Sequence, residues 1–368
     1  MCAIRRVISW SVVVLSRTRP QRRVFVWPLA RSESIGYSGS LRQLFAVLAF
    51  FGLLAGSGFA ATISAFNTDD QVSTAAVWLI NQQQDDGGFP GFTGESDASV
   101  TADALIALMA ASSLGFDSEL DSAVEFLAEN ALVMAQTGPG LAAKLSLALI
   151  AFDLNPRDFA DVNPLSIVEM DARDGQIGFG PYDHALGLLA LTAAGESAPS
   201  ASVEYALNTQ SEDGGWAFDG STEAGTADTN TTSLMIRALK ASAADEPEAF
   251  DRASMYLISA QTEGGGFPYQ HDGPEDSNST ALAVQALIAL DFDSTHDPLR
   301  RAVEALSVFQ NANGSFSWML DERDENMFST VQALPALVDA SAIAAMYDAG
   351  LPMAATPILS PVALVEAA

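Results

Sequence analysis

One stretch indicates the fold of the chain: Gln261-Thr-Glu-Gly-Gly-Gly-Phe267, followed after a short loop by Asp276-Ser-Asn-Ser-Thr-Ala-Leu-Ala-Val-Gln-Ala-Leu-Ile-Ala-Leu290. Consecutive glycines end a helix at little steric cost, because glycine readily adopts the positive φ of a helix C-terminal cap. The Asp/Ser/Asn/Ser/Thr run can accept hydrogen bonds from the free N–H groups of a first helical turn. The Ala/Leu/Val run after it is apolar nearly all round, which is typical of a buried helix. The stretch therefore predicts an outer helix, a turn and a buried inner helix.

The same unit recurs along the chain. A turn of the form Gln-x-x-x-Gly-(Gly/Ser)-aromatic begins at Gln83, Gln210, Gln261 and Gln310, and an Asp- or Asn-led apolar run follows each one. More degenerate turns stand near residues 135 and 174. A recurring period of about 50 residues indicates a repeat architecture. We therefore predict six helical hairpins.

Six hairpins with buried inner helices predict a closed ring. An open stack would leave one side of the inner helices in water, and closure removes that exposed side. We predict an all-α fold, an (α/α)6 toroid in which six inner helices are surrounded by six outer ones, over residues 61–350. A short helix at Ser341–Ala349 is expected to close the last gap.

The charge of the chain is divided unevenly. Its formal net charge is −29, yet residues 1–60 hold eight arginines, no lysine and a single acid, Glu33. The rest of the chain is strongly acidic, and Lys144 and Lys240 are its only lysines. Such a body repels phosphate backbones and anionic membrane surfaces, so we expect no nucleic-acid partner and no membrane contact beyond the N-terminal segment.

Residues 41–61 have the pattern of a secretory signal. Arg42 precedes an apolar run, and the small residues Gly58 and Ala60 suit a signal peptidase site. We expect cleavage near Ala60 and a secreted, periplasmic or cell-surface protein, with an uncleaved anchor as the alternative. Residues 1–60 would thus be a basic extension plus signal, and 351–368 a proline-containing tail. Cys2 is the only cysteine, so the mature chain would have no disulfide and no thiolate site.

The glutamine–glycine–aromatic turns resemble the repeats of squalene and hopene cyclases. More widely, the chain is similar to the terpenoid cyclase and protein prenyltransferase toroid superfamily, whose fold is shared by the larger domain of the cobalamin carriers. The resemblance covers residues of about 66–350. It implies the toroid fold and leaves the function open, because one fold hosts many functions.

The catalytic motifs of these families are altered in this chain. Class II cyclases protonate an alkene with the middle acid of an Asp-x-Asp-Asp motif at the start of an inner helix. In the matching stretches Asp228-Thr-Asn-Thr and Asp276-Ser-Asn-Ser, that position holds Asn230 and Asn278, which have no transferable proton. The zinc of the prenyltransferases is held by Asp, Cys and His, and the mature chain has no Cys. We therefore expect no catalytic residues, no metal and no cofactor, and we lean against an enzyme.

The resemblance to the cobalamin carriers implies a ligand site at one rim of the barrel. In those carriers, polar residues at the starts of inner helices contact the ligand. The same residue types are also ordinary helix N-caps, so capping alone is the competing interpretation. The residues that would meet at this rim are Asp97, Asp103, Tyr182, Asp183, His184, Asp228, Asn230, Asp276, Asn278 and Asn326.

The sequence thus favours an exported, monomeric, non-catalytic module whose polar rim binds a small or lipidic ligand, similar to cobalamin or an isoprenoid. One alternative is an enzyme, either a degenerate cyclase-type isomerase or a glycan-active (α/α)6 barrel that uses an acid such as Asp183 or Asp228. A third interpretation is an acidic scaffold for protein partners, whose binding would depend strongly on salt.

Overall fold

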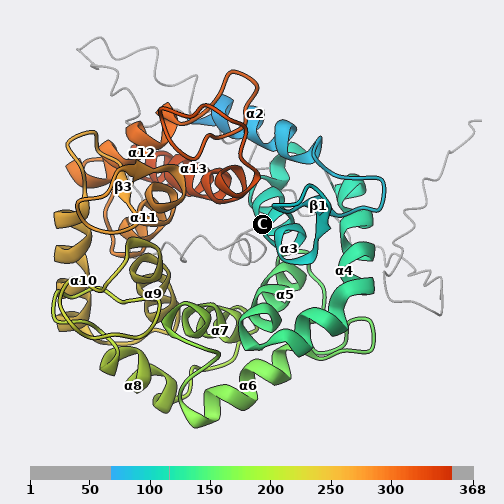
Figure 1. The fold of residues 1–368 in the computed structure, drawn as a ribbon, viewed down its shortest axis with the longest axis horizontal. Coiled ribbons are helices and arrows are strands. Elements are labelled where there is room, and N and C mark those ends of the chain that lie inside the picture. Colours follow the sequence, from blue (N-terminus) through green and yellow to red (C-terminus); the bar gives the residue numbers. More distant parts are fainter. Residues whose placement is uncertain (1–67, 116, 350–368) are drawn as a thin grey trace, which may run out of the picture. The chain divides into compact units, whose positions relative to one another are not determined.

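The computed structural model describes residues 68–115 and 117–349. The expected signal segment, its cleavage site and the tail at 351–368 lie outside these residues. The described part forms two concentric rings of helices (Figure 1). Outer and inner helices alternate along the described chain, as the repeat predicts.

The outer ring contains six helices. They are α2 (Asp69–Ile80), α4 (Asp117–Thr137), α6 (Pro164–Asp174), α8 (Ser200–Asn208), α10 (Pro247–Ala260) and α12 (Asp297–Val308). The inner ring contains the other six α-helices of the described residues. They are α3 (Ala98–Ala110), α5 (Pro139–Ala151), α7 (Pro181–Ala193), α9 (Thr229–Ala241), α11 (Ser277–Ala289) and α13 (Met327–Asp348).

The ring closes on itself. Each inner helix packs against the next one, and α13 packs against both α3 and the first outer helix, α2. The predicted (α/α)6 toroid is confirmed. The separate helix predicted at Ser341–Ala349 is wrong, because these residues continue α13 to its C-terminal cap. Pro335 interrupts one backbone hydrogen bond in α13, but the buried stripe of Val331, Leu334 and Leu337 runs on past it, and its burial outweighs that loss.

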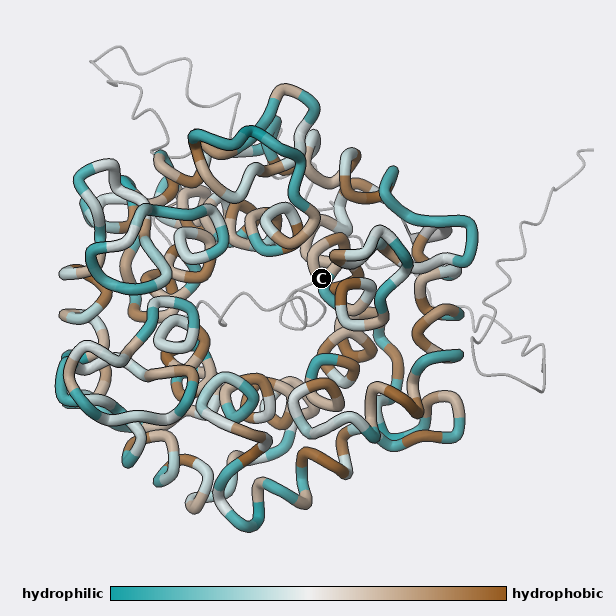
Figure 2. Tube along the Cα trace, in the orientation of Figure 1, coloured by the Kyte–Doolittle hydropathy of each residue, from teal (hydrophilic) through white to brown (hydrophobic). Residues whose placement is uncertain are grey.

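The hydrophobic core lies between the two rings. The largest fully buried side chains include Trp216, Phe89, Phe267, Phe309 and Phe316, and the rest of this core is mainly Leu and Ala from both rings. Hydrophilic residues dominate in the connecting loops (Figure 2). Two of these loops contain a pair of two-residue antiparallel strands, β1 (Phe89–Pro90) with β2 (Ser96–Asp97) and β3 (Phe267–Pro268) with β4 (Glu275–Asp276).

In the four repeats that begin with Gln83, Gln210, Gln261 and Gln310, a threonine side chain holds the aromatic residue of the turn through a hydrogen bond. Phe89, Trp216, Phe267 and Phe316 are fully buried, and the backbone N–H of each donates a hydrogen bond of 2.8 to 2.9 Å to a threonine Oγ1. That threonine always lies four residues after the Asp or Asn that caps the inner helix. The four acceptors are Thr101, Thr232, Thr280 and Thr330. Each turn is thereby attached to the inner helix that follows it.

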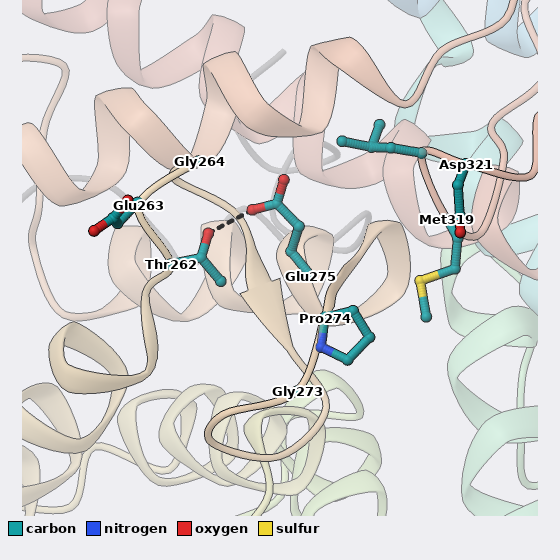
Figure 3. Close-up of a pocket in the computed structure, with 9 residues that line it drawn as sticks. Thr262, Glu263, Gly264, Gly273, Pro274, Glu275, Met319 and Asp321 are labelled. Atoms are coloured by element: carbon teal, nitrogen blue, oxygen red, sulfur yellow. Dashed lines mark hydrogen bonds between the residues drawn. The ribbon is translucent and has the colours of Figure 1, made fainter.

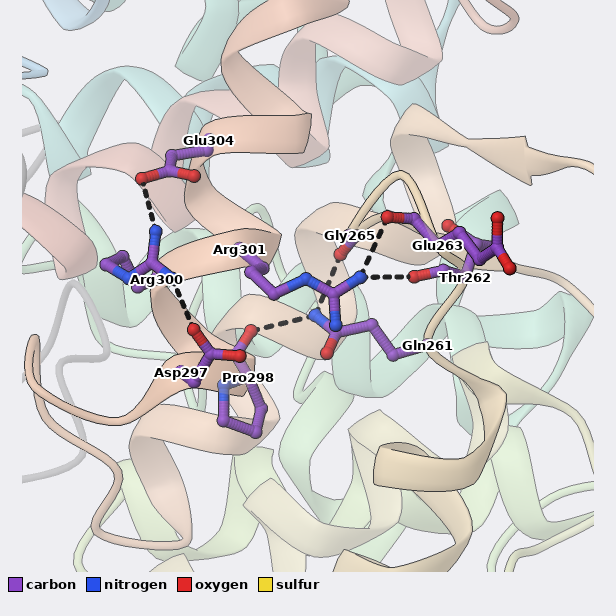
Figure 4. Close-up of polar contacts among 9 residues, drawn as sticks. All are labelled: Gln261, Thr262, Glu263, Gly265, Asp297, Pro298, Arg300, Arg301 and Glu304. Carbon is purple, nitrogen blue, oxygen red and sulfur yellow. Dashed lines mark hydrogen bonds and ion pairs between the residues drawn. The ribbon is translucent and has the colours of Figure 1, made fainter.

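The glutamine of the repeat joins its turn to the next outer helix (Figure 4). Gln261 Nε2 donates to the Gly265 carbonyl and to the Pro298 carbonyl in α12, both at 2.8 Å. The guanidinium of Arg301, also in α12, donates to the carbonyls of Thr262 and Glu263. Gln310 makes the corresponding bonds in the last repeat, to Gly314 and to Gln71 in α2, so that this contact also spans the closure of the ring.

The glycine of the repeat touches the backbone of the next outer helix. Gly265 and Gly314 have φ angles of +94° and +97°, a region that side chains with a Cβ rarely adopt. A Cβ at Gly265 would lie 2.7 Å from the Arg301 carbonyl oxygen, and one at Gly314 only 2.2 Å from that of Thr74 in α2. Gly87 and Gly214 approach α4 and α10 in the same way. Only glycine allows consecutive hairpins to pack this closely.

We predict that Gly314→Ala destabilises the toroid far more than Gly225→Ala. Gly225 has a similar φ of +81°, but nothing lies within 4 Å of an added Cβ, so its substitution costs only the backbone strain, about 1 kcal/mol. At Gly314 the α2 backbone must also move, and we expect a loss of about 3 kcal/mol or more. Urea unfolding of both variants measures the difference. Equal losses would contradict the close contact as a determinant of the fold.

Candidate functional site

Four of the predicted rim residues are helix N-caps. Their side chains accept a hydrogen bond of 2.7 to 2.9 Å from the backbone N–H three residues further on, at the starts of α3, α9, α11 and α13. These four residues are Asp97, Asp228, Asp276 and Asn326. Burial raises the pKa of Asp228 and of Asp276, and hydrogen bonds from Thr231 and Ser279 oppose that rise.

Asp183 and His184 make local contacts at the start of α7. Asp183 accepts a hydrogen bond from the Phe179 N–H at 3.1 Å. His184 is fully buried, its Nδ1 accepts from the Ile177 N–H, and its Nε2 lies 3.0 Å from the Ser202 carbonyl oxygen. Since a carbonyl only accepts, Nε2 carries the proton and the ring is neutral. Burial lowers the pKa of His184 to about 4, against the opposing bond to Ser202. This histidine joins the turn before α7 to α8.

Asp103, Tyr182, Asn230 and Asn278 lie on a different surface. On α3, α5 and α13, less buried positions recur every three or four residues on one side, as at Ser99, Asp103 and Ile106 in α3, whereas most of the matching positions on α9 and α11 are buried. Outer helices and neighbouring inner helices cover the other sides. We call the remaining side, which is turned toward the ring axis, the inner face. Its polar and charged residues are Asp103, Lys144, Tyr182, Asn230, Arg237, Asn278, Gln285, Gln332 and Asp339.

These polar residues pair between adjacent inner helices. Lys144 Nζ in α5 lies 2.8 Å from Asp103 Oδ2 and 2.9 Å from Ser99 Oγ in α3. Burial alone would lower the pKa of Lys144, but Asp103 and Tyr182 raise it above its usual value, so the lysine is charged. Between α11 and α13, Asn278 Nδ2 donates to Gln332 Oε1 at 2.9 Å.

A second cluster of polar and charged side chains, Arg237, Gln285 and Asp339, lies on α9, α11 and α13. Gln285 Nε2 donates to Asp339 Oδ2 at 2.8 Å. Burial raises the pKa of Asp339 to about 7, although the bond from Gln285 and the charge of Arg237 lower it. Burial lowers the pKa of the Arg237 guanidinium, whereas Asp339 and Tyr182 raise it. An arginine stays protonated at any physiological pH, so Arg237 carries a full charge on the inner face.

Five residues of the inner face were not predicted from the sequence: Lys144, Arg237, Gln285, Gln332 and Asp339. The inner helices were predicted to be apolar nearly all round, so isolated polar residues within them were assigned no role. The sequence does contain a signal for such residues, because burying an unpaired charge within an apolar run costs free energy. Arg237 in Leu-Met-Ile-Arg-Ala-Leu is such a charge, and so is Lys144 in Leu-Ala-Ala-Lys-Leu-Ser.

A set of exposed aromatic residues was missed as well. Each lies two or three residues after the buried residue of a turn, in the loop that leads to an inner helix. The Tyr269 carbonyl accepts from the Thr229 N–H at the start of α9, and the Trp318 carbonyl from the Ser277 N–H at the start of α11. Phe92 stacks on Phe328 at the start of α13, with ring centroids 4.0 Å apart. We call these residues the rim aromatics: Phe92, Phe179, Phe218, Tyr269 and Trp318, all 45% or more exposed.

An open groove of about 440 Å³ lies between the loop that precedes α11 and the loop that precedes α13 (Figure 3). It is lined by the glycine turn at Thr262–Gly264, by Gly273–Glu275 and by Met319–Asp321. The Thr262 hydroxyl donates to Glu275, one of three acids in the lining. No basic side chain lines it, and it contains none of the predicted site residues.

Two further properties concern residues 68–115 and 117–349, metal binding and the insertion of a helix into a membrane. No group of three or more His, Cys, Asp or Glu side chains there converges to hold a metal ion. By length and composition α13 could cross a membrane, but 67% of its most apolar stretch is buried in the toroid. This helix therefore belongs to the core.

Two segments match models of known families. Residues 200–309 match the squalene-hopene cyclase N-terminal domain, and residues 31–142 match the prenyltransferase alpha-alpha toroid domain. The predicted resemblance to the terpenoid cyclase and prenyltransferase toroids is confirmed. No curated protein sequence matches this toroid.

Solved structures share the fold at low identity. A variant of the type II terpene cyclase MstE from Scytonema, in complex with geranylgeranyl dihydroxybenzoate, is 15% identical with a TM-score of 0.57, over 76% of this chain and 99% of that one. The GH76A alpha-1,6-mannanase from Salegentibacter sp. HEL1_6 is 12% identical with a TM-score of 0.56, over 74% and 99%. A protein from Actinoplanes is 15% identical with a TM-score of 0.54, over 75% and 100%. At these identities the similarity establishes the fold alone.

We predict that His184 makes the toroid less stable in acid. Its pKa of about 4 lies below the ordinary value of 6.5, so the unfolded chain binds the proton first and stability falls as the pH drops from 6.5 toward 4. The loss attributable to His184 is about 3 kcal/mol. Urea unfolding at several pH values should show that His184→Gln lacks this part of the pH dependence. Parallel curves for the variant and the wild type would contradict the buried neutral imidazole.

Proposed function

We propose that the toroid is an exported binding module that holds a small amphiphilic ligand against its inner face. The observation that supports this proposal is the charged inner face itself. Replacing buried ion pairs by apolar residues is often neutral or stabilising, so such pairs are weak contributors to a fold. Asp103, Lys144, Arg237 and Asp339 each stand between two apolar residues in the sequence of an inner helix. Ligand binding would explain why these charged residues are present, whereas folding does not require them.

Apolar surface accompanies the charges. Ile106, Leu147 and Leu186 are half-buried on the same side of α3, α5 and α7 as the polar residues, and the rim aromatics stand where the inner helices begin. Sites for small molecules are mostly apolar, with a few placed polar groups. An elongated ligand with one polar end fits this distribution. The cyclase MstE has been solved with geranylgeranyl dihydroxybenzoate, which makes a lipidic ligand a natural choice in this fold.

The ten predicted rim residues enter this proposal in two ways. Asp103, Tyr182, Asn230 and Asn278 lie on the inner face and would contact the ligand. The four N-caps, Asp183 and His184 are hydrogen-bonded within the protein, and in our proposal they hold the inner helices and turns in place. The proposed site is therefore deeper in the ring than the rim predicted from the sequence.

Catalysis is the second candidate, and one observation favours it. With a pKa of about 7, Asp339 is half protonated at neutral pH, and a general acid works best when its pKa lies near the operating pH. The toroids of known structure that match this chain include a terpene cyclase and a mannanase. Turnover of a polyprenyl or oligosaccharide substrate, lost in Asp339→Asn, would establish this second function.

Native mass spectrometry of residues 61–368, isolated gently from the exported protein, tests the binding module. We expect a discrete added mass of several hundred daltons. The two lysines of the chain offer a matched pair of variants, because Lys144 lies on the inner face whereas Lys240 pairs with the exposed Asp291. The added mass should be lost in Lys144→Met and retained in Lys240→Met. A bare wild-type protein, or equal retention in both variants, would contradict the proposal.

A further inference from the structure

Basic residues are scarce in the toroid, and most have an evident structural partner. Only nine occur after residue 60. Lys144, Arg157, Lys240 and Arg300 form ion pairs with acids, and Arg252, Arg301 and Arg323 donate to backbone carbonyls. The two that remain are Arg173, which is exposed at the end of α6, and Arg237, which is half-buried on the inner face. Among residues 68–115 and 117–349, no carboxylate lies within ion-pair distance of the Arg237 guanidinium.

Two further polar groups beside Arg237 lack partners. Asn230 and Ser233 precede it by seven and four residues, so the three lie on one stripe of α9. Asn230 Oδ1 and Ser233 Oγ are buried, and neither has a hydrogen-bond partner in the described part of the chain. Buried polar atoms are nearly always paired. A polar group of a bound ligand could form hydrogen bonds with all three side chains, the charged Arg237 and the unpartnered Asn230 and Ser233.

The stripe is suited to an anion. A guanidinium binds a carboxylate through two parallel hydrogen bonds. The Ser233 hydroxyl can donate a third, and the amide of Asn230 can turn its NH2 group inward, since the two ends of an amide are exchanged by a simple rotation. Among the described residues, Asp339 on α13 is the carboxylic acid whose charge acts on Arg237, and its side chain is held by Gln285. An anion bound at Arg237 would therefore add negative charge close to this carboxyl group.

We propose that Arg237 anchors a carboxylate at the polar end of the ligand, and that Asp339 takes up one proton from solvent when this carboxylate binds. This inference rests on the proposed binding function and names the chemical class of its ligand. In the coupled step the ligand keeps its charge, Arg237 stays protonated, and the Asp339 carboxylate becomes a neutral acid. Its O–H can then donate a hydrogen bond, whereas two adjacent carboxylates would repel each other.

Among residues 68–115 and 117–349, the other charged groups on the helices that pack against α13 either have partners of their own or are exposed. The elements packed against α13 are α2, α3, α11 and α12, and α11 contains no charged residue. Asp103 of α3 is paired with Lys144, and Asp69 of α2 accepts from Ser341, while Asp70 is exposed. On α12 the charged residues are engaged with one another or with the adjacent turn, namely Asp297, Arg300, Arg301 and Glu304. In the described part of the chain, Arg237 is thus the one charged group that acts on Asp339.

Binding of cis-parinaric acid, measured by its fluorescence and compared with its uncharged methyl ester, tests the anchor. The wild type should bind the acid more tightly than the ester. Arg237→Gln should weaken binding of the acid by 10- to 100-fold and leave the ester unchanged, as expected for losing hydrogen bonds between charged groups. Arg173→Gln is the matched control, because Arg173 is exposed at the end of α6. It should change neither affinity.

The pH dependence tests the proton uptake. A fatty acid has a carboxyl pKa near that of Glu and is ionised throughout pH 6 to 9. Its Kd should stay constant below pH 7 and rise by about tenfold per unit above it, because Asp339 must then be reprotonated on binding. In Asp339→Asn the Kd should not vary with pH.

The outcomes separate the anchor from the binding function. Equal affinity of the wild type for acid and ester, unchanged by Arg237→Gln, would overturn the anchor and leave the binding module intact. A pH dependence that persists in Asp339→Asn would overturn the proton uptake. If the wild type binds neither probe, the lipidic ligand of the proposed function and the carboxylate anchor both fail.

Discussion

The close contact between the glycine of each turn and the backbone of the next outer helix is the constraint on which the toroid depends. It lets neighbouring hairpins approach to a distance that any side chain would prevent, as the positions of Gly265 and Gly314 show. The same contact occurs at four turns, at Gly87, Gly214, Gly265 and Gly314. The final copy, between Gly314 and Thr74, joins the end of the described chain to its beginning. The glutamine and threonine bonds then fix each turn to the helices on both sides.

This arrangement separates the fold from the candidate site. All contacts that define the repeat lie in the turns and between the two rings, so the inner face is left free to vary. The chain places charged and amide side chains there, in pairs such as Asp103 with Lys144 and Gln285 with Asp339. The threonines and aromatic residues of the repeat recur from hairpin to hairpin, whereas the charged residues of the inner face show no such repeat. We interpret the repeat as the scaffold and the non-repeating inner face as the specific part.

The sequence predicted the fold well because the fold depends on local, repeated signals. The period, the turns and the apolar helices sufficed for the number of hairpins and for ring closure. The end of α13 was mispredicted, since a proline normally ends a helix and only tertiary packing carries α13 past Pro335. The candidate site was harder to predict. Asp97 and Asp276 have the right residue types at the right place, but their side chains cap helices. Arg237 and Asp339 are 102 positions apart, and only the closed ring brings their charges into range.

The central claim is that the charges of the inner face serve a ligand and contribute little to folding. Urea unfolding of the double variant Arg237→Met/Asp339→Leu at pH 7 tests this most directly. If the claim is correct, the free energy of unfolding equals or exceeds that of the wild type, because apolar residues of similar size avoid the desolvation of two charged groups. A loss of about 3 kcal/mol or more would show that the Arg237–Asp339 group holds the toroid together, and would contradict our account of the inner face.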